Sequence, residues 1–359
     1  MRQYGIAVIP GDGIGIEVVQ AGLRVLQVLQ DREPKLRLQL KTFPWGCNYY
    51  HKHGRMMAQD GLEILRKFDA IYFGAVGDPT TVPDHISLWG LRLPICQGFD
   101  QYANVRPARI LSGITSPVHD CRSGDLDWVI VRENTEGEYS GFGGRGHRGM
   151  PEEVAIETAL FTRAGVTRIM RFAFKLARKR PRRHLTFVTK SNAQRYGMLM
   201  WDEIFMEVAK DYSDVTTDRE LVDAMTIRMV LKPRTLDVLV ATNLHADILS
   251  DLAAVLSGSL GIAPSANFNP EGTFPSMFEP IHGSAPDIAG KGIANPIAAF
   301  WTAVMMLEHL GEAEAAARLM AAIECVTAAG DVLTPDLGGT ATTKQVTDAV
   351  CEALTTANT

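Results

Sequence analysis

Short apolar runs alternate with longer amphipathic stretches along nearly the whole chain, and this alternation constrains the fold more than any other feature. It predicts strands at 5–10, 36–43, 70–74, 128–132, 185–189 and 238–242, and helices at 14–30, 62–68, 163–179, from about 192, 245–256, 295–309 and 312–328. Strands that alternate with helices are typical of α/β layers. The 359 residues exceed the roughly 250–300 at which a single core stops growing, so we expect two lobes. No Pro/Gly/Ser-rich linker separates them, so one lobe can be discontinuous.

Composition excludes several classes of protein. A formal net charge of −5 does not indicate a binder of polyanions. The apolar stretches are broken well short of the ~20 residues that a membrane helix needs, so we expect no membrane association. The N-terminus lacks the pattern of a signal peptide. Five scattered cysteines without C-x-x-C spacing predict reduced thiols, a cytoplasmic location and no zinc site.

The turn Gly11-Asp12-Gly13-Ile14-Gly15 joins the first strand to the first helix, where a dinucleotide-binding fold carries G-x-G-x-x-G. The third glycine of that fingerprint would fall on Ile16. Asp31 lies in a polar turn before the second predicted strand, instead of at the end of that strand. We therefore interpret the glycines as a tight turn that needs positive φ. The P-loop pattern G-x-x-x-x-G-K-[ST] is absent as well.

A later segment, 279–296, is the stronger candidate for a cofactor site. It reads EPIHGSAPDIAGKGIANP, which is too irregular for a helix or a strand. Exposed backbone N–H groups in such a loop can hold a pyrophosphate. Asp287 can accept hydrogen bonds from an adenosine ribose and would repel a 2′-phosphate, which favours NAD over NADP. An ordinary ordered loop explains the same composition equally well.

Asp247 and Asp251 lie four residues apart in a predicted helix, which puts both carboxylates on one face. A hard divalent cation, Mg²⁺ or Mn²⁺, would relieve their repulsion. Such a pair is more often only a solvated face, but Ile248, Leu249 and Leu252 indicate a largely buried helix. Asp223, an acid within an apolar segment, is the candidate for a third ligand.

Three arginines, Arg92, Arg106 and Arg132, stand next to apolar residues, a setting that suits bidentate capture of carboxylates. Surface arginines with buried stems are the alternative. Lys190 follows a predicted strand, at the edge where α/β proteins bind ligands. Tyr139, in the polar stretch after Arg132, is a further candidate, although each residue taken singly is more often structural.

The basic run 178–183 ends a predicted helix, where cations complement the helix dipole. It has no interleaved aromatic residues, so an RNA-binding protein that uses the region near Arg180 is only a weak alternative.

The combination of motifs resembles the metal-dependent β-decarboxylating dehydrogenases, which include the isopropylmalate, isocitrate and tartrate/D-malate dehydrogenases. The matching runs are IPGDGIG, ANVRPA, RENTEGEYSG, VTKSNA, VDAMT, NLHADILSDL, FEPIHGSAPDIAGKGIANP and DLGGTA, and they span nearly the whole chain. The resemblance implies an isopropylmalate dehydrogenase-like α/β fold of two open domains. It implies a discontinuous large cofactor-binding domain at 1–103 and 255–359, and a small domain at 104–254 with substrate, metal and dimer contacts. It also implies a homodimer with shared active sites, with the matches to Lys190 and Asp223 supplied by the partner subunit.

The resemblance also implies roles for individual residues. It implies an acid–base pair of Tyr139 and Lys190, and a metal site of Asp223, Asp247 and Asp251. The implied substrate contacts are Ser87, Trp89, Arg92, Arg106 and Arg132. The implied cofactor contacts are Ile14, Asn192, His282, Gly283, Ser284, Ala285, Asp287, Ile288 and Asn295. The implied cofactors are NAD and Mn²⁺ or Mg²⁺, and a monovalent cation is a further candidate.

The segment SLWGLRLPICQGFDQYANVRP resembles most the tartrate/D-malate branch. The isopropylmalate branch has a Leu-Leu pair where this chain has Leu88-Trp89, and a Glu where it has His85. A bulky indole should leave room only for a small C4 acid. The implied activity is NAD- and metal-dependent oxidation and β-decarboxylation of a C4 2-hydroxy diacid, either D-malate or tartrate. The alternative within the family is 3-isopropylmalate dehydrogenase.

Overall fold

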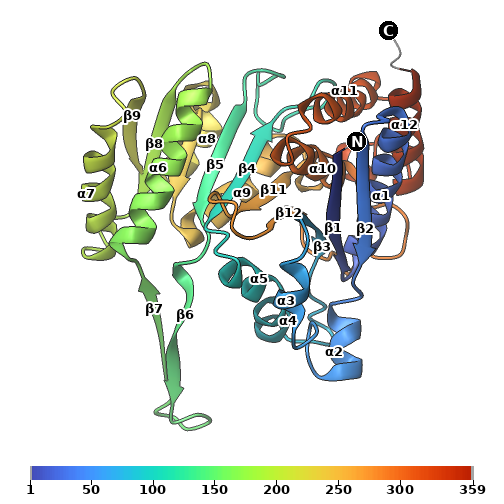
Figure 1. Ribbon diagram of the computed structural model, residues 1–359. Helices are drawn as coiled ribbons and strands as arrows, with labels where there is room; N and C mark the ends of the chain where they lie inside the picture. The colour runs from blue at the N-terminus through green and yellow to red at the C-terminus, as the bar shows by residue number, and fades with distance from the viewer. Residues whose placement is uncertain (1, 357–359) are drawn as a thin grey trace.

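A computed structural model describes residues 2–356 of the chain (Figure 1). The strands are β1 (Arg2–Gly11), β2 (Leu36–Thr42), β3 (Ala70–Ala75), β4 (Ala103–Arg109), β5 (Asp127–Glu133), β6 (Gly137–Gly146), β7 (Val154–Leu160), β8 (His184–Thr189), β9 (Thr216–Leu221), β10 (Val238–Ala241), β11 (Pro264–Phe268) and β12 (Ser276–Pro280). The helices are α1 (Ile14–Arg32), α2 (Cys47–His53), α3 (Gly61–Leu65), α4 (Asp84–Gly90), α5 (Arg92–Gly98), α6 (Arg163–Lys179), α7 (Gly197–Ala209), α8 (Val222–Leu231), α9 (Asn243–Leu256), α10 (Ile297–His309), α11 (Ala313–Ala329) and α12 (Thr343–Thr356).

A ten-stranded sheet runs through the molecule in the order β2-β1-β3-β12-β11-β4-β5-β10-β8-β9. Its two ends are parallel wings, β2-β1-β3-β12 and β5-β10-β8-β9. Antiparallel pairings of β11 with β12 and β4, and of β4 with β5, join the wings. Short strands alternating with helices thus build an α/β sheet, as the sequence predicts.

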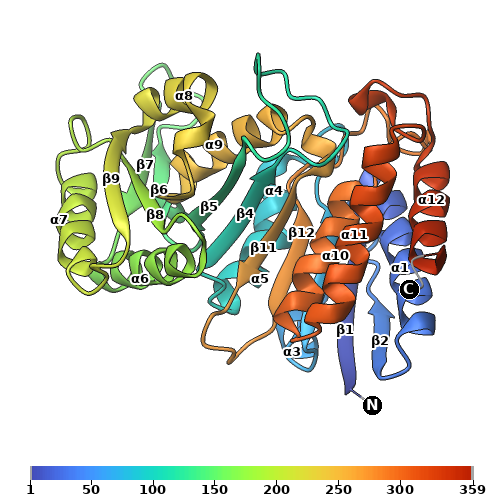
Figure 2. The ribbon, with the colours of Figure 1, turned by 90° about the horizontal axis from the view of Figure 1, so that it is seen from above.

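Helices cover both faces of this sheet (Figure 2). On the second wing, α6 and α7 lie on one face, and α8 and α9 lie on the other (Figure 2). The largest core cluster combines Val8 and Val25 from the first wing with Trp128 and Leu249 from the second. The apolar interior is therefore continuous across the antiparallel centre of the sheet.

Threonine caps fix where two helices of the second wing begin. The Thr162 hydroxyl accepts a hydrogen bond from the backbone N–H of Gly165 at the start of α6 (2.9 Å). The Thr242 hydroxyl accepts one from the N–H of His245 at the start of α9 (3.4 Å). Such caps satisfy N–H groups that have no partner within the helix. Because Thr242 directly follows β10, the cap places the first turns of α9 at the carboxyl edge of the sheet.

Several elements differ from the sequence-based expectation. The hairpin β6–β7, which projects from the body of the molecule (Figure 1), lacks the alternating pattern of a half-buried strand because it is glycine-rich and largely exposed. The helix expected from about 192 begins at Gly197, since the hydroxyls of Thr189 and Ser191 donate to Asp202 and hold the intervening residues in a turn. The sequence patterns also did not predict the strands β4, β9, β11 and β12 or the helices α2, α4, α5, α8 and α12.

Candidate active site

A cavity of about 180 Å³ lies at the carboxyl ends of β3, β5 and β12, where α/β sheets commonly bind ligands. The sequence analysis named most of the polar residues that line it. Among the lining residues are Leu88, Arg92, Arg106, Arg132, Tyr139, Asp247, Glu279, His282 and Gly283. The structure therefore brings together the three predicted arginines, one of the predicted metal ligands, the predicted acid and part of the cofactor loop.

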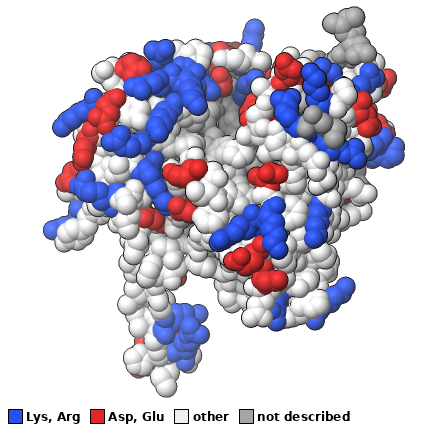
Figure 3. Space-filling view, in the orientation of Figure 1, with Lys and Arg blue, Asp and Glu red and all other residues white. Residues whose placement is uncertain are grey.

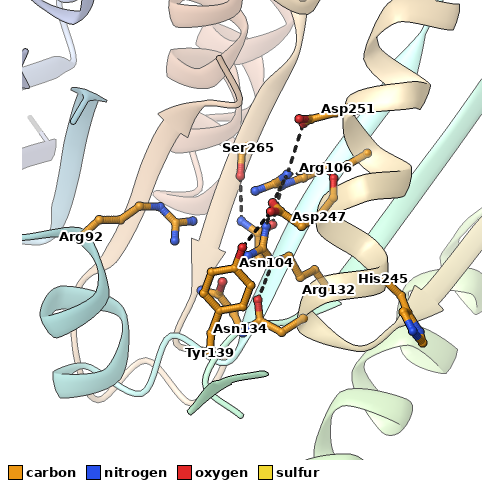
Figure 4. Close-up of polar contacts among 12 residues, drawn as sticks. Arg92, Asn104, Arg106, Arg132, Asn134, Tyr139, His245, Asp247, Asp251 and Ser265 are labelled. Carbon is orange, nitrogen blue, oxygen red and sulfur yellow. Dashed lines mark hydrogen bonds and ion pairs between the residues drawn. The ribbon is translucent and has the colours of Figure 1, made fainter. Parts of the chain in front are cut away.

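Buried polar side chains hold the arginines in place. Arg92, at the start of α5, donates from Nε to Glu279 Oε1 (2.8 Å), and its Nη2 lies 2.7 Å from the same oxygen. Arg106, on β4, donates to the side chains of Asn104 (2.7 Å) and Ser250 (2.6 Å). Figure 4 shows Asn104, Arg106 and Arg132 close together, with Arg92 to one side of them. All three guanidinium groups are nearly removed from solvent, a setting that strengthens their attraction for a carboxylate.

Arg132 and Arg106 both face Asp247 on α9 (Figure 4). The Tyr139 hydroxyl donates to the other carboxylate oxygen, Asp247 Oδ2, at 3.0 Å. Burial opposes ionisation of Asp247, but the charges of Arg132 and then Arg106 outweigh it and hold its pKa below the ordinary value. Burial and the Asp247 charge raise the pKa of Tyr139, so its hydroxyl keeps its proton at neutral pH. Asp251 lies one turn further along α9, with Oδ1 4.0 Å from Arg106.

Lys190 and Asp223 lie outside this cavity and pair with each other. Lys190 Nζ lies 2.5 Å from Asp223 Oδ1, and this hydrogen bond lowers the pKa of Asp223. Within residues 2–356, no group of three or more His, Cys, Asp or Glu side chains is placed to hold a metal ion. In a single chain the carboxylates of Asp247 and Asp251 are thus separate from that of Asp223. This arrangement leaves the predicted partner-subunit origin of Lys190 and Asp223 untested.

The opening glycine turn packs against the late loop. Gly11 and Gly13 have φ of 72° and 55°. A Cβ on Gly13 would lie 2.0 Å from the Ser284 carbonyl oxygen, and the N–H of Ile14 donates to that same oxygen (2.8 Å). The glycines therefore permit a close approach of two backbone segments, in agreement with the tight-turn interpretation.

The other predicted cofactor residues follow the path of the late loop. His282 is buried, burial lowers its pKa, and its Nε2 atom has no hydrogen-bond partner among residues 2–356. The Asn295 side chain donates to Asp336 (3.0 Å) and accepts from the N–H of Ile297. Asp287 and Gly283 are exposed, Ala285 and Ile288 are half-buried, and Ser284 is buried. Asn192 lies apart from the loop, in the exposed turn after Lys190.

The two remaining predicted substrate contacts, Ser87 and Trp89, do not line the cavity, whereas their neighbour Leu88 does. The Ser87 hydroxyl is buried and donates to the Asp84 carbonyl (3.4 Å). The Trp89 indole is 40% exposed and packs on Gly141 of the hairpin, where a Cβ would lie 2.8 Å from the ring. Trp89 thus lies beside the cavity, between α4 and β6.

Sequence reasoning missed the buried polar groups behind the arginines. Glu279 holds Arg92, and Asn267 donates to Glu279 (2.8 Å). Asn104 donates to Asn267 (2.9 Å). Asn104 and Asn267 are fully buried on strands, where the apolar neighbours of each asparagine are the signal that could have found them. Glu133 is also fully buried, and burial raises its pKa to about 7.

Several arginines of the basic run 178–183 are paired with carboxylates or donate to backbone carbonyls. Arg178 pairs with Asp214, and Arg180 pairs with Asp127 and Asp237. Arg182 donates to the carbonyls of Asp127 and Arg234. These contacts give the run a structural role and lend no support to the RNA-binding alternative. In the part of the chain that the structure describes, we find no helix with the length and apolar character needed to span a membrane.

The fold and the site together define a dehydrogenase family. The family model described as "Isocitrate/isopropylmalate dehydrogenase" matches residues 5–350, so the chain belongs to this family and is an oxidoreductase. The chain is 70% identical to a probable tartrate dehydrogenase/decarboxylase of Agrobacterium vitis, over 100% of this chain and 98% of that one. It is 51% identical to the decarboxylating D-malate dehydrogenase of Escherichia coli K12, over 99% of both chains. A crystal structure of isocitrate dehydrogenase from Methylococcus capsulatus is similar, with a TM-score of 0.87 and 36% identity over 98% of this chain and 99% of that one. The predicted family and fold class are thereby confirmed.

Proposed function

We propose that this chain oxidises a small C4 2-hydroxy diacid with NAD and a divalent metal ion, and β-decarboxylates the product. D-malate would give pyruvate and CO₂, and tartrate would be oxidised in the same site. The observation that carries this proposal is the small cavity with three buried guanidinium groups, Arg92, Arg106 and Arg132. Guanidinium groups bind carboxylates bidentately, and about 180 Å³ suits a compact diacid. The relatives named for tartrate and D-malate support the same substrate class.

The donor set fits a hard divalent cation. Asp247 and Asp251 offer carboxylate oxygens from successive turns of α9, and Asp223 of a second copy would complete the set. Bound Mn²⁺ or Mg²⁺ supplies a Lewis acid that lowers the pKa of a substrate hydroxyl. The late loop fits NAD, because His282 Nε2 is a buried polar atom that finds no partner in the described part of the chain, and Asp287 is exposed for a ribose.

Different residues of the chain would carry out the binding and proton-transfer steps of the reaction. The arginines would hold the substrate carboxylates and so fix the orientation of C2 in the cavity. Lys190 of the second copy would accept the proton of the 2-hydroxyl, and NAD held by the late loop would supply the acceptor for the hydride of C2. The bond from C3 to its carboxylate breaks, CO₂ leaves, and the electron pair stays on C3. Tyr139, whose raised pKa keeps it protonated, donates a proton to C3.

A homodimer would supply Lys190 and Asp223 to the neighbouring site. Exposed apolar side chains mark two surfaces for this contact: Ile227, Val230, Leu231, Ile248 and Val255 on α8 and α9, and Phe142, Met150, Val154 and Ile156 on the hairpin. Clustered apolar side chains in solvent are typical of protein interfaces. A twofold dimer would create two equivalent sites. The large domain would comprise 1–103 and 255–359, the small domain 104–254, and the free cysteines suit a cytoplasmic location.

A side-by-side assay tests this proposal. The purified protein is given D-malate, each tartrate stereoisomer or 3-isopropylmalate, with NAD and Mn²⁺, and both NADH and CO₂ are measured. We expect turnover of at least one C4 diacid and far lower kcat/KM for 3-isopropylmalate. Preference for 3-isopropylmalate would favour the alternative within the family. Salt-sensitive RNA binding without NADH formation would favour the alternative from the other class.

A further inference from the structure

A second cavity, of about 380 Å³, lies between α6 and the turn that joins β11 to β12. We call it the α6 groove. Four cationic side chains of α6 line it: Arg168, Arg171, Lys175 and Lys179. Their spacing of three and four residues puts all four on one face of the helix. The reaction proposed above uses none of them.

The two lysines give the groove an excess of positive charge. Arg168 pairs with Asp100 (2.7 Å) and Arg171 with Asp211 (2.9 Å). None of the ion pairs within residues 2–356 includes Lys175 or Lys179, and both side chains are exposed. The lining includes one carboxylate, Glu271, which accepts a hydrogen bond from the Tyr102 hydroxyl (3.0 Å). Figure 3 shows Lys and Arg side chains gathered over the face that α6 covers.

The floor of the groove is apolar and rigid. Phe172 and Leu176 are half-buried between the cationic side chains, and Phe172 packs against Phe268 with ring centroids 6.3 Å apart. The Arg168 guanidinium lies over the Tyr102 ring, 4.1 Å from its centroid. The opposite wall is formed by Pro270 and Glu271 of the β11–β12 turn. Next to them, the Asn269 side chain accepts hydrogen bonds from Thr273 and Phe274 and fixes this turn. A preformed apolar floor with cations at its rim suits a ligand that has a flat ring and several negative charges.

We propose that the α6 groove binds a purine nucleoside di- or triphosphate, with the ring on Phe172 and Leu176 and the phosphates at Lys175 and Lys179. Lysine ammonium groups are strong donors to phosphate oxygens, and two of them one helical turn apart can contact successive phosphates. The groove lies on the face of the second wing opposite α8 and α9 (Figure 2), so it stays open in the proposed dimer. The site is separate from the late loop and does not depend on the proposed reaction.

Equilibrium dialysis of the intact protein with GTP tests this assignment. The groove variant is Lys175→Glu/Lys179→Glu, and the control is Lys35→Glu/Lys52→Glu, which makes the same charge change at exposed lysines of the other wing. We expect the groove variant to bind GTP at least about tenfold more weakly than the wild type and the control, because two charge-assisted contacts are lost. Circular dichroism and the KM for NAD should be the same in all three proteins.

Ligand fragments test the two halves of the site. Tripolyphosphate and guanosine should each bind at least about tenfold more weakly than GTP, because each lacks one half of the contacts. Tripolyphosphate that binds as tightly as GTP would overturn the nucleotide assignment. GTP binding that the groove variant retains, or that is absent in the wild type, would overturn the site itself. Retained binding that NAD displaces would instead belong to the cofactor loop.

Discussion

The buried pair of Arg92 and Glu279 gives a prediction whose magnitude follows from its geometry. Both side chains are almost fully removed from solvent, and Arg92 Nε lies 2.8 and 3.1 Å from the two carboxylate oxygens. Burial opposes ionisation of Glu279, but the Arg92 charge outweighs it and holds its pKa below the ordinary value. Glu279→Gln keeps the shape of the side chain and leaves the Arg92 charge without a counter-ion.

Removing one partner of a buried ion pair costs about 3–5 kcal/mol. For 359 residues, an unfolding entropy of roughly 2 cal/mol/K per residue converts this cost into a fall in Tm of about 4–7 °C. Urea and thermal unfolding at fixed protein concentration measure both quantities. A diacid should raise the Tm of Glu279→Gln more than that of the wild type, because its carboxylate supplies the missing counter-charge.

Two further variants separate this electrostatic effect from general damage. Glu63→Gln, at an exposed position, should leave the free energy of unfolding within about 0.5 kcal/mol of the wild-type value. Arg92→Met/Glu279→Gln removes both charges and should be more stable than Glu279→Gln alone. Unfolding of Glu279→Gln at the wild-type midpoint would refute the electrostatic effect. So would a double variant Arg92→Met/Glu279→Gln that is less stable than Glu279→Gln.

Three other substitutions test separate parts of the account. Lys190→Met should abolish NADH formation while calorimetry still detects NAD binding, and full activity would refute its role as the base. Trp89→Leu removes a ring that packs on Gly141 beside the cavity, outside its lining, and should widen substrate choice toward 3-alkylmalates, measured as kcat/KM ratios. An unchanged profile would remove Trp89 from substrate selection. The pKa of Glu133, raised by burial to about 7, means that the folded state keeps a proton which the unfolded state releases, so this group's contribution to stability falls as pH rises from about 4.5 to 7. The wild type should lose up to about 3 kcal/mol of unfolding free energy over that pH range, and Glu133→Gln should lack this loss, which urea unfolding at each pH measures. Parallel curves of unfolding free energy against pH for the two proteins would contradict the raised pKa of Glu133.

Hydrophobic periodicity predicted the elements that are buried on one or both faces. The runs that became β1, β3, β8 and β10 are continuous or alternating apolar stretches, and the helices that cover them carry an apolar face. The hairpin β6–β7 escaped prediction because its residues pack against little of their own chain and so show no period. The strands β11 and β12 escaped because serine, asparagine and proline interrupt their apolar residues.

The site was predictable in part because its charged residues flank strand ends. Arg132 lies at the carboxyl end of β5 and Asp247 in the first turns of the helix after β10, so the parallel order of β5 and β10 brings them together. Glu279 was quoted within the late loop, but its pairing with Arg92 depends on a contact between residues 187 apart in the chain. Local spacing holds no information on such a pair. The assignment of Lys190 and Asp223 to a second subunit rests on the family resemblance, because the spacing of residues in one sequence does not show which residues of two copies lie close together.

If two copies of this chain share each metal site, two inactive variants should complement each other in a mixed dimer. Asp223→Asn and Asp251→Asn are co-expressed with different affinity tags, and the mixed dimer is purified through both tags. One of its two sites then contains both substitutions and the other contains neither. We expect both parent dimers to be inactive and the mixed dimer to have about half of the wild-type Mn²⁺-dependent activity. A mixed dimer as inactive as its parents would contradict a site shared between subunits.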